Sequence, residues 1–284
     1  QELELFMFSE RVGAGLPIWL PKGNALRDRL MNFLREEQEK RGYQLVTTPH
    51  IGKKELYVTS GHYAKYGEDS FQPIHTPKEG EEFLLKPMNC PFHILIFGSR
   101  GRSYRELPLR LFELGTVYRY ERSGVVHGLL RARGFTQDDS HIFAMESQIG
   151  EELQGLLDFT LMVLRDFGFE EFEADLSTRP DKYVGQDHLW DKAEAALADA
   201  LRVAGLPFEI AEGEGVSARV ESELFAVALA FEQRGYGSGE SLLVIRRGFS
   251  QRRHVDAVGE EDRADVPAVD LLGELDDILF ALLL

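Results

Sequence analysis

The chain has 284 residues, of which 43% are hydrophobic and 28% are charged, and its net charge is −16. These values are ordinary for a globular protein with enough core for one large domain or two small ones, and no run of 18 or more apolar residues that could span a membrane is present. The single cysteine, Cys90, excludes an internal disulfide and suits a reducing compartment. Because the first residues also lack the pattern of a secretory signal, we expect a cytoplasmic protein without membrane contact.

The acidic charge is concentrated in the second half of the sequence. Residues 1–150 carry 20 Lys and Arg against 19 Asp and Glu, whereas residues 151–284 carry 12 against 29. Between Arg100 and Arg133 there are eight arginines and three glutamates. The total charge argues against a nucleic-acid partner, but the arginine-rich window favours forked contacts to phosphate or carboxylate groups. A solvated surface with scattered ion pairs is the alternative explanation of that window.

Apolar spacing and glycine or proline boundaries predict the elements of the first hundred residues. A helix is expected from Asn24 to about Lys40, ended by Gly42, and a strand from Tyr43 to Pro49. The segments that follow are an amphipathic piece near 53–60, a loop up to residue 80, a strand that opens residues 81–91, and a helix that starts in residues 91–98.

The middle of the sequence predicts a β-hairpin. Residues 108–121 mix apolar and polar positions as strands do, a glycine-bearing loop follows at 123–128, and a further strand runs through Phe135. Helices are then expected at 151–167, 189–204 and 222–233, and strands at 169–180, 206–215 and 241–249. Because strands and helices alternate irregularly, we expect an α+β fold and not a doubly wound parallel sheet.

The stretch RARGFTQDDSHIF, residues 131–143, combines cationic, aromatic, amide, carboxylate and imidazole side chains. If the two strands of the hairpin pair, then Arg119, Arg131 and Phe135 can converge on one face of the sheet. There the arginines could hold a polyphosphate and the ring could stack on a purine. Exposed strand charges and a core aromatic ring are the alternative explanation.

Further along the same stretch, Gln137 and Asp139 are two residues apart, so on a strand their side chains lie on the same sheet face. There Asp139 could hold a substrate ammonium group. Cys90, His93 and His141 are donor types that suit zinc, and Cys90 and His93 have the spacing of a short ligand pair. Most lone cysteines are simply buried apolar groups, which is the alternative here. The sequence contains no glycine-rich phosphate loop, so a bound nucleotide would lie on a sheet face.

Five segments together resemble the catalytic core of threonyl-tRNA synthetases: GLPIWLPKGNALRDRL, IGKKELYVTSGHYAKYGEDSF, LLKPMNCPFHILIF, RSYRELPLRLFELGTVYRYERSG and RARGFTQDDSHIF. The likeness is continuous over about residues 5–214, and PMNCP together with FTQDDSHIF separates this family from its seryl, prolyl and histidyl relatives. It implies a class II synthetase core, in which an antiparallel sheet is flanked by helices. The resemblance also implies a homodimer formed through the segment at residues 24–49.

The resemblance implies a function and a nucleotide site. Members of the family use ATP, with Mg²⁺, to activate threonine as threonyl-adenylate and then transfer the threonyl group to tRNA. By resemblance, Arg119 contacts the α-phosphate of ATP and Arg131 contacts the γ-phosphate. Glu121 meets the adenine edge, and Phe135 stacks on the adenine ring.

A threonine site is implied in the same way. Cys90 and His141 match two of the three zinc ligands of the family, whose zinc binds the amino and hydroxyl groups of threonine and so rejects valine. Asp139 is expected to hold the threonine ammonium group, and Gln137 is expected to line the same pocket. A site that pairs with a hydroxyl disfavours an isostere that lacks one far more than an apolar pocket can.

The likeness ends after residue 215. We therefore expect a catalytic core at residues 1–215 and a separate C-terminal segment, without an assigned fold, at residues 216–284. The family's third zinc ligand and the arginine of its third motif have no match in that segment. The alternative to an active ligase is a catalytically inactive relative, or a truncated form, that acts as a binding or regulatory protein.

Overall fold

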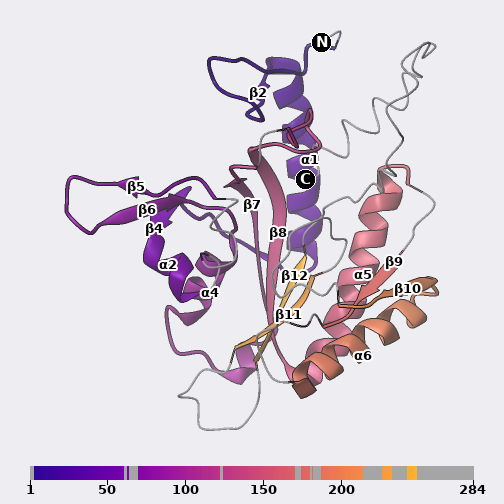
Figure 1. Ribbon diagram of the computed structural model, residues 1–284. Coiled ribbons are helices and arrows are strands. Elements are labelled where there is room, and N and C mark those ends of the chain that lie inside the picture. Colours follow the sequence, from indigo (N-terminus) through magenta and orange to yellow (C-terminus); the bar gives the residue numbers. More distant parts are fainter. Residues whose placement is uncertain are drawn as a thin grey trace.

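The computed structural model describes residues 3–60, 63, 70–121, 124–169, 174–179, 181, 187–213, 226–231 and 242–247. Its centre is a five-stranded sheet in the order β11-β12-β8-β7-β3, flanked by helices (Figure 1). The strands are β3 (Gln44–Leu45), β7 (Leu109–Tyr118), β8 (Gly134–Met145), β11 (Ala226–Phe231) and β12 (Leu242–Arg247). Neighbouring strands are antiparallel except β3, which runs parallel to β7. The expected α+β fold is confirmed.

The helices follow the predicted spacing closely. They are α1 (Pro21–Lys40), α2 (Lys54–Thr59), α4 (Cys90–Gly98), α5 (Ile149–Asp166) and α6 (Asp187–Val203), with 3-10 turns η1 (Tyr104–Glu106) and η2 (Glu146–Gln148). Helix α1 begins three residues before the expected Asn24 because Pro21, which lacks a backbone N–H, suits the first helical position. No helix in the described part of the chain is long and apolar enough to cross a membrane.

The predicted hairpin forms the middle of the sheet, and β7 and β8 pair along the whole length of β7. The second strand was expected to include Arg131, and this prediction is wrong. The backbone of Arg131 pairs instead with His127 inside the connection, so the strand begins at Gly134. Arg131 therefore lies in the turn region and not on the sheet face.

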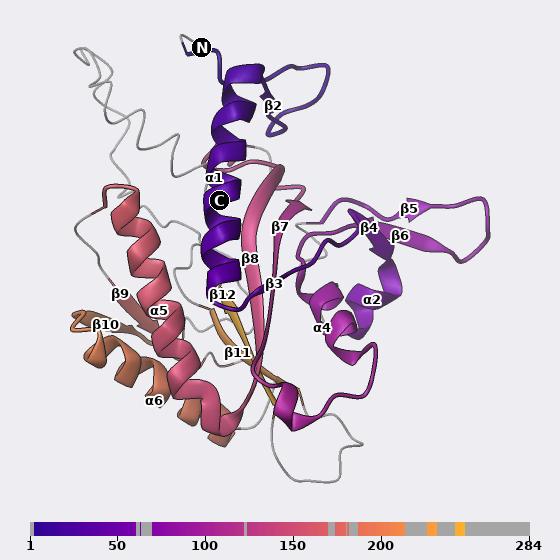
Figure 2. The ribbon, with the colours of Figure 1, turned by 180° about the vertical axis from the view of Figure 1, so that it is seen from behind.

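The two faces of β8 point into different cores. Its even-numbered residues Ile142 and Ala144 pack with α5 and α6 in the main hydrophobic cluster. Its odd-numbered residue Phe143 stacks on Phe97 of α4, with ring centroids 4.3 Å apart. Helices α4 and α5 accordingly lie on opposite sides of the hairpin in both views (Figures 1 and 2). The period-2 pattern of the strand therefore decides which side chains meet α4.

Helix α1 packs on the same side as α5. Leu34 of α1 is buried against Phe159 and Val163 of α5. The amide of Gln38, which is fully buried, donates to Asp138 of β8 over 2.7 Å. This contact satisfies a polar pair that would otherwise be costly inside the core.

Smaller sheets complete the described part. They are the pair β1 (Phe6–Met7) with β2 (Ile18–Trp19), the three strands β4 (Ile51–Lys53), β6 (Glu82–Leu85) and β5 (Ile74–His75), and the parallel pair β9 (Ala174–Ser177) with β10 (Phe208–Ala211). Strands were predicted where β6, β9 and β10 lie, whereas β5 falls in an expected loop. The strand expected to run from Tyr43 to Pro49 is shorter, because the N–H of Thr48 donates to the side chain of Glu113 and not to a ladder.

The helix expected at 222–233 is wrong: residues 226–231 form strand β11, which pairs with β12. The apolar run AVALAF has no polar positions that would distinguish a period of 3.6 from a period of 2. The strand expected at 241–249 is confirmed as β12, which pairs with the edge of β8 that β7 leaves open. Pairing at that edge satisfies the backbone donors and acceptors of β8.

Candidate active site

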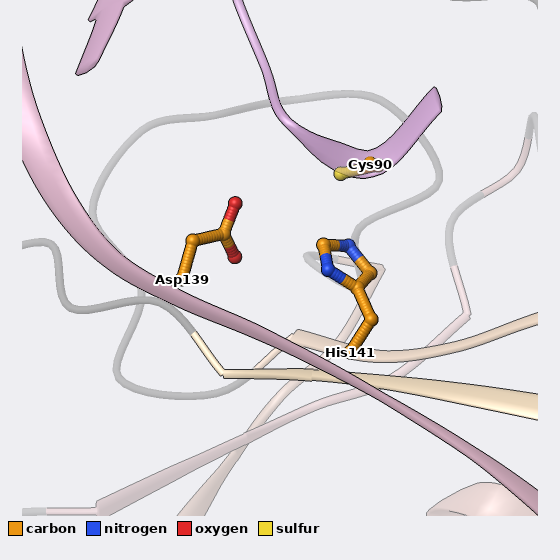
Figure 3. Close-up of side chains that lie close together, drawn as sticks. All are labelled: Cys90, Asp139 and His141. Carbon is orange, nitrogen blue, oxygen red and sulfur yellow. The ribbon is translucent and has the colours of Figure 1, made fainter. Parts of the chain in front are cut away.

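Three side chains with metal-binding atoms meet between α4 and β8. Cys90, Asp139 and His141 each offer one ligand atom, and these atoms all lie within 4.8 Å of one another (Figure 3). All three side chains are buried. All three residues are candidates from the sequence, but of the three only Cys90 and His141 are expected there to bind a metal.

Local structure explains why these three residues meet. Asp139 and His141 are two residues apart on β8, so both side chains leave the sheet on the face that meets α4. Cys90 is the first residue of α4, and Pro91 helps to start that helix at this position. The helix thus begins directly over the strand, and its first side chain reaches the strand's acidic and imidazole groups.

The donor set of this cluster fits zinc. Zn²⁺ in proteins is bound by thiolate sulfur, imidazole nitrogen and carboxylate oxygen, and tolerates few other donors. Within the described ranges, Cys90, Asp139 and His141 form such a set in a site with little access to water. The cluster could hold one zinc ion and leave coordination positions for a substrate.

Asn89, which is not among the site residues predicted from the sequence, holds Asp139 in place. Its amide Nδ2 donates to Asp139 Oδ2 over 3.0 Å, and both residues are fully buried. Asn89 needs the space left by Gly115 of β7, where a Cβ would lie 2.6 Å from Asn89 Nδ2. A glycine in a strand interior is a signal of such a close approach, and it was the one available clue.

Of the nucleotide residues predicted from the sequence, Phe135 lies near the start of β8, and the other three follow the end of β7 or lie in the connection: Arg119, Glu121 and Arg131. The Arg119 guanidinium lies 5.2 Å from the centre of the Phe135 ring, and its Nε donates to the carbonyl of Pro87 over 3.4 Å. Phe135 and Asp139 are on the same face of β8, four residues and therefore about 13 Å apart along the strand. Arginine and ring are thus brought together, on the face that carries the metal-binding cluster.

Arg131 and Glu121 form a second pair, in the hairpin connection. Arg131 Nε lies 2.9 Å from Glu121 Oε2, and the arginine side chain is about half exposed. Glu121 has a positive φ of 49°, which turns the chain where it leaves β7. The structure therefore brings Arg131 to Glu121, while Arg119 meets Phe135.

Gln137 lies between Phe135 and Asp139 on the same face of β8. Its side chain is buried, and its Oε1 has no hydrogen-bond partner among the described residues. Buried amide oxygens are seldom left without a donor. Gln137 is therefore suited to accept a hydrogen bond from a substrate bound between Phe135 and Asp139.

His93 does not belong to the metal-binding cluster, although it is three residues from Cys90 on α4. Its Nδ1 lies 2.8 Å from Nδ1 of His141, and its Nε2 lies 3.3 Å from Oε1 of Glu113. His93 therefore lies behind His141 as a hydrogen-bonding partner. The spacing of three along a helix correctly placed it near Cys90 but could not distinguish a ligand from a partner of a ligand.

Charges beneath the cluster are paired. Glu113 of β7 lies 3.5 Å from the ammonium group of Lys86, and both side chains are buried. Burial by itself raises the pKa of Glu113, but hydrogen bonds from His93 and Thr48 and the charge of Lys86 outweigh it and hold the pKa below its ordinary value. Burial lowers the pKa of Lys86 in spite of the neighbouring carboxylate. The carboxylate of Glu113 is thus stabilised as an anion.

Comparisons with known proteins agree on one family. Residues 73–264 match the family model of the tRNA synthetase class II core domain (G, H, P, S and T). The chain is 59% identical over 218 residues to the threonine–tRNA ligase of Flavobacterium johnsoniae and 56% identical over 218 residues to that of Bacteroides thetaiotaomicron. Each of these matches covers 75% of this chain and 34% of the relative.

A solved structure is similar along almost the whole chain. It is that of the RNA binding domain of threonyl-tRNA synthetase from Cryptosporidium parvum, with a TM-score of 0.78 and 32% sequence identity. The match covers 99% of this chain and 69% of that one. The chain thus spans about a third of the length of the curated relatives it matches.

Proposed function

The chain belongs to the threonyl-tRNA synthetase family of class II synthetase cores, and we propose that it activates threonine with ATP and transfers the threonyl group to tRNA. The observation that carries this proposal is the shared face of β8. One end of that face has the Arg119–Phe135 pair, and the other has the buried cluster of Cys90, Asp139 and His141. Such a face can bind a nucleotide and an amino acid end to end.

The nucleotide end is suited to ATP. Phe135 stacks on the adenine ring and Glu121 accepts from its amino edge, while Arg131 binds the γ-phosphate with Mg²⁺ present. In activation, the threonine carboxylate attacks the α-phosphorus, an adenylate bond forms, and pyrophosphate leaves. Arg119 lies beside Phe135 and neutralises the charge that develops on the α-phosphate during this step.

The amino-acid end is suited to threonine. Cys90 and His141 would hold a zinc ion, which supplies a Lewis acid able to bind an amino and a hydroxyl group together. Asp139, oriented by Asn89, accepts from the threonine ammonium group, and Gln137 accepts from the bound substrate. Valine lacks the hydroxyl, so it leaves a buried polar position unpaired and binds much more weakly.

The proposal extends to partners. The threonyl acceptor is tRNA, and the arginine-rich window at residues 100–133 provides forked donors for its phosphates. A homodimer would form through α1 and the strand that follows it, residues 24–49. The cytoplasm is the compartment in which such a ligase acts.

The test is threonine-dependent exchange of pyrophosphate into ATP by the purified, zinc-loaded chain, with serine and valine as controls. We expect exchange with threonine, much less with serine and almost none with valine. Asp139→Asn should raise the KM for threonine at least tenfold with little change in the KM for ATP, because a charged hydrogen bond of about 1.5–3 kcal/mol is lost.

Absence of exchange from folded, zinc-loaded protein would contradict the ligase proposal. Calorimetric binding of ATP or threonine without turnover would then support the alternative, a catalytically inactive relative that acts as a binding or regulatory protein. A full-length relative mixed with the chain provides the positive control for the assay.

A further inference from the structure

We propose that His93, oriented by Glu113, is a positioning residue that decides which ring nitrogen of His141 is presented to the metal. The inference rests on the proposed zinc site and goes beyond it, because it assigns a role to a histidine that is not a ligand. Its basis is a buried chain of hydrogen bonds that leads from β7 through α4 to β8.

The geometry of this chain is continuous. Glu113 Oε1 lies 3.3 Å from His93 Nε2, and His93 Nδ1 lies 2.8 Å from His141 Nδ1. The two imidazole rings meet edge to face, with centroids 4.7 Å apart and an interplanar angle of 77°. His93 is fully buried, and the other two residues are no more than 3% exposed.

Glu113, at one end of this series of hydrogen bonds, determines which atoms donate and which accept along it. Glu113 accepts from the backbone N–H of Thr48 over 3.1 Å and from the Thr48 hydroxyl over 2.8 Å. The same hydroxyl accepts from the ammonium group of Lys86 over 2.8 Å, and that group lies 3.5 Å from Glu113. A carboxylate surrounded by donors and a cation is an anion that can only accept.

Because Glu113 accepts, the position of the proton on each imidazole ring in the series can be assigned in turn. His93 Nε2 must carry a proton to donate to Glu113, and a ring with a single proton accepts at its other nitrogen, Nδ1. Nδ1 of His141 must therefore carry the proton shared between the two rings. The lone pair of His141 then lies on Nε2, which is the nitrogen that a metal would take.

Metal-binding histidines commonly donate their second nitrogen to a carboxylate or carbonyl group, which fixes the ring and raises its basicity. In this series of hydrogen bonds, an additional histidine, His93, lies between the potential ligand His141 and the carboxylate of Glu113. Because His93 and Cys90 are three residues apart on α4, one helix carries both a ligand and the residue that orients a second ligand. A shift of α4 would therefore alter both at once.

Two matched substitutions at His93 test the proposal. Asparagine places its terminal atoms near the position of Nδ1, so His93→Asn keeps an acceptor for His141. Glutamine reaches the position of Nε2, so His93→Gln keeps the contact with Glu113 and loses the one with His141. Zn²⁺ affinity, measured by competition with a chromophoric chelator, should stay close to that of the wild type in His93→Asn and fall about 10–100-fold in His93→Gln.

The visible absorption of bound Co²⁺ gives a second readout that does not depend on activity. Its intensity and band positions should be retained in His93→Asn and changed in His93→Gln. Equal affinities and spectra in the two variants would overturn the role of His93 and leave the zinc site standing. Failure of the wild-type chain to bind Zn²⁺ or Co²⁺ would instead remove the zinc site of the proposed function, and the inference with it.

A measurement on the unaltered chain covers the case in which the buried substitutions prevent folding. Long-range ¹⁵N–¹H spectra of ¹³C- and ¹⁵N-labelled protein report the tautomer of each ring, and the ring of His141 is assigned through its bonds to its own backbone. We expect Nδ1 of His141 to be protonated and Nε2 to be unprotonated, before and after zinc is added. The opposite tautomer would overturn the proposal.

Discussion

At position 115 of β7 the chain carries a glycine, and the reason is Asn89, the residue that directly precedes helix α4. A Cβ there would lie 2.6 Å from Nδ2 of Asn89 and 2.8 Å from two further atoms of the same side chain. Asn89 in turn donates to Asp139, which is the carboxylate proposed to hold the threonine ammonium group. One missing methyl group thus permits the hydrogen bond from Asn89 to Asp139.

We expect Gly115→Ala to weaken threonine binding about tenfold or more, because Asn89 must move and Asp139 loses a charged hydrogen bond of about 1.5–3 kcal/mol. The KM for ATP should change little, since the Arg119–Phe135 pair lies at the other end of the face. Steady-state pyrophosphate exchange with each substrate varied in turn provides both constants.

The matched control is Gly155→Ala on the exposed face of α5, where an added Cβ meets no heavy atom within 4 Å. This substitution should leave both constants unchanged and stabilise the helix by about 0.5–1 kcal/mol. Equal KM values for threonine in the two variants would show that Asn89 does not orient Asp139.

At the scale of elements, one ion pair ties the sheet to its main covering helix. Arg110 of β7 forms a forked pair with Glu152 of α5, in which Nε lies 2.6 Å from Oε2 and Nη2 donates to Oε1. The side chain of Glu152 is 4% exposed and that of Arg110 is 28% exposed. Loss of one partner from such a pair is expected to be more harmful than loss of both.

Glu152→Ala should therefore lower the free energy of unfolding by about 2–3 kcal/mol, because Arg110 keeps a partly buried charge without its partner. The double variant Arg110→Met with Glu152→Leu should recover most of this loss. Urea unfolding at neutral pH measures both. Asp199→Ala, which breaks the exposed pair with Arg202, is the control and should change the free energy by about 0.5 kcal/mol or less.

A second element, the turn η1, has a pH-dependent cap. Hydrogen bonds from Arg100, and then from the N–H of Ser103, lower the pKa of Glu106 from 4.5 to about 2. Because the pKa is lower in the folded chain, the stability that this carboxylate contributes is present above about pH 4.5 and is lost as the pH falls toward 2. The group is exposed, so its contribution is small.

The expected result is a difference in melting temperature between the wild type and Glu106→Gln that stays constant from pH 7 to about pH 5. Below that, the difference should shrink steadily as Glu106 becomes protonated. Scanning calorimetry of both proteins from pH 7 to pH 3 measures it. A difference that grows on acidification would contradict the assigned hydrogen bonds.

For the whole molecule, the position of the metal-binding cluster matters most. It lies where α4 meets the central sheet, so a bound zinc ion would connect two layers that otherwise share side-chain packing. Zinc at 100 times its dissociation constant adds about 2.7 kcal/mol if it binds the folded chain alone. For a chain of this size that corresponds to a rise of about 4–5 °C in melting temperature.

We therefore expect the melting temperature to rise on addition of zinc and to return to its starting value on addition of a chelator. Cys90→Ser should abolish the rise, because a hydroxyl is a poor zinc ligand of nearly the same size as the thiol. An equal rise in this variant would place the bound zinc elsewhere on the molecule.

The sequence by itself determined the local structure and the identity of most candidate site residues. Helical spacing predicted α1 and α5, and alternation predicted the hairpin and the shared face of Gln137 and Asp139. These features depend on residues that are close in the sequence, and the periods of 3.6 and 2 record them directly. The α+β class followed from the order of the elements.

Only the tertiary structure decided how distant segments meet. Within the helix expected at 222–233, residues 226–231 form strand β11. An apolar run without polar positions suits either a helix or a strand, and here pairing with β12 favours the strand. The tertiary structure also showed that Asn89 needs the glycine at 115, and that His93 contacts a potential ligand rather than joining the cluster itself. Such contacts depend on how α4 packs on β7 and β8, and no period in the sequence records that packing.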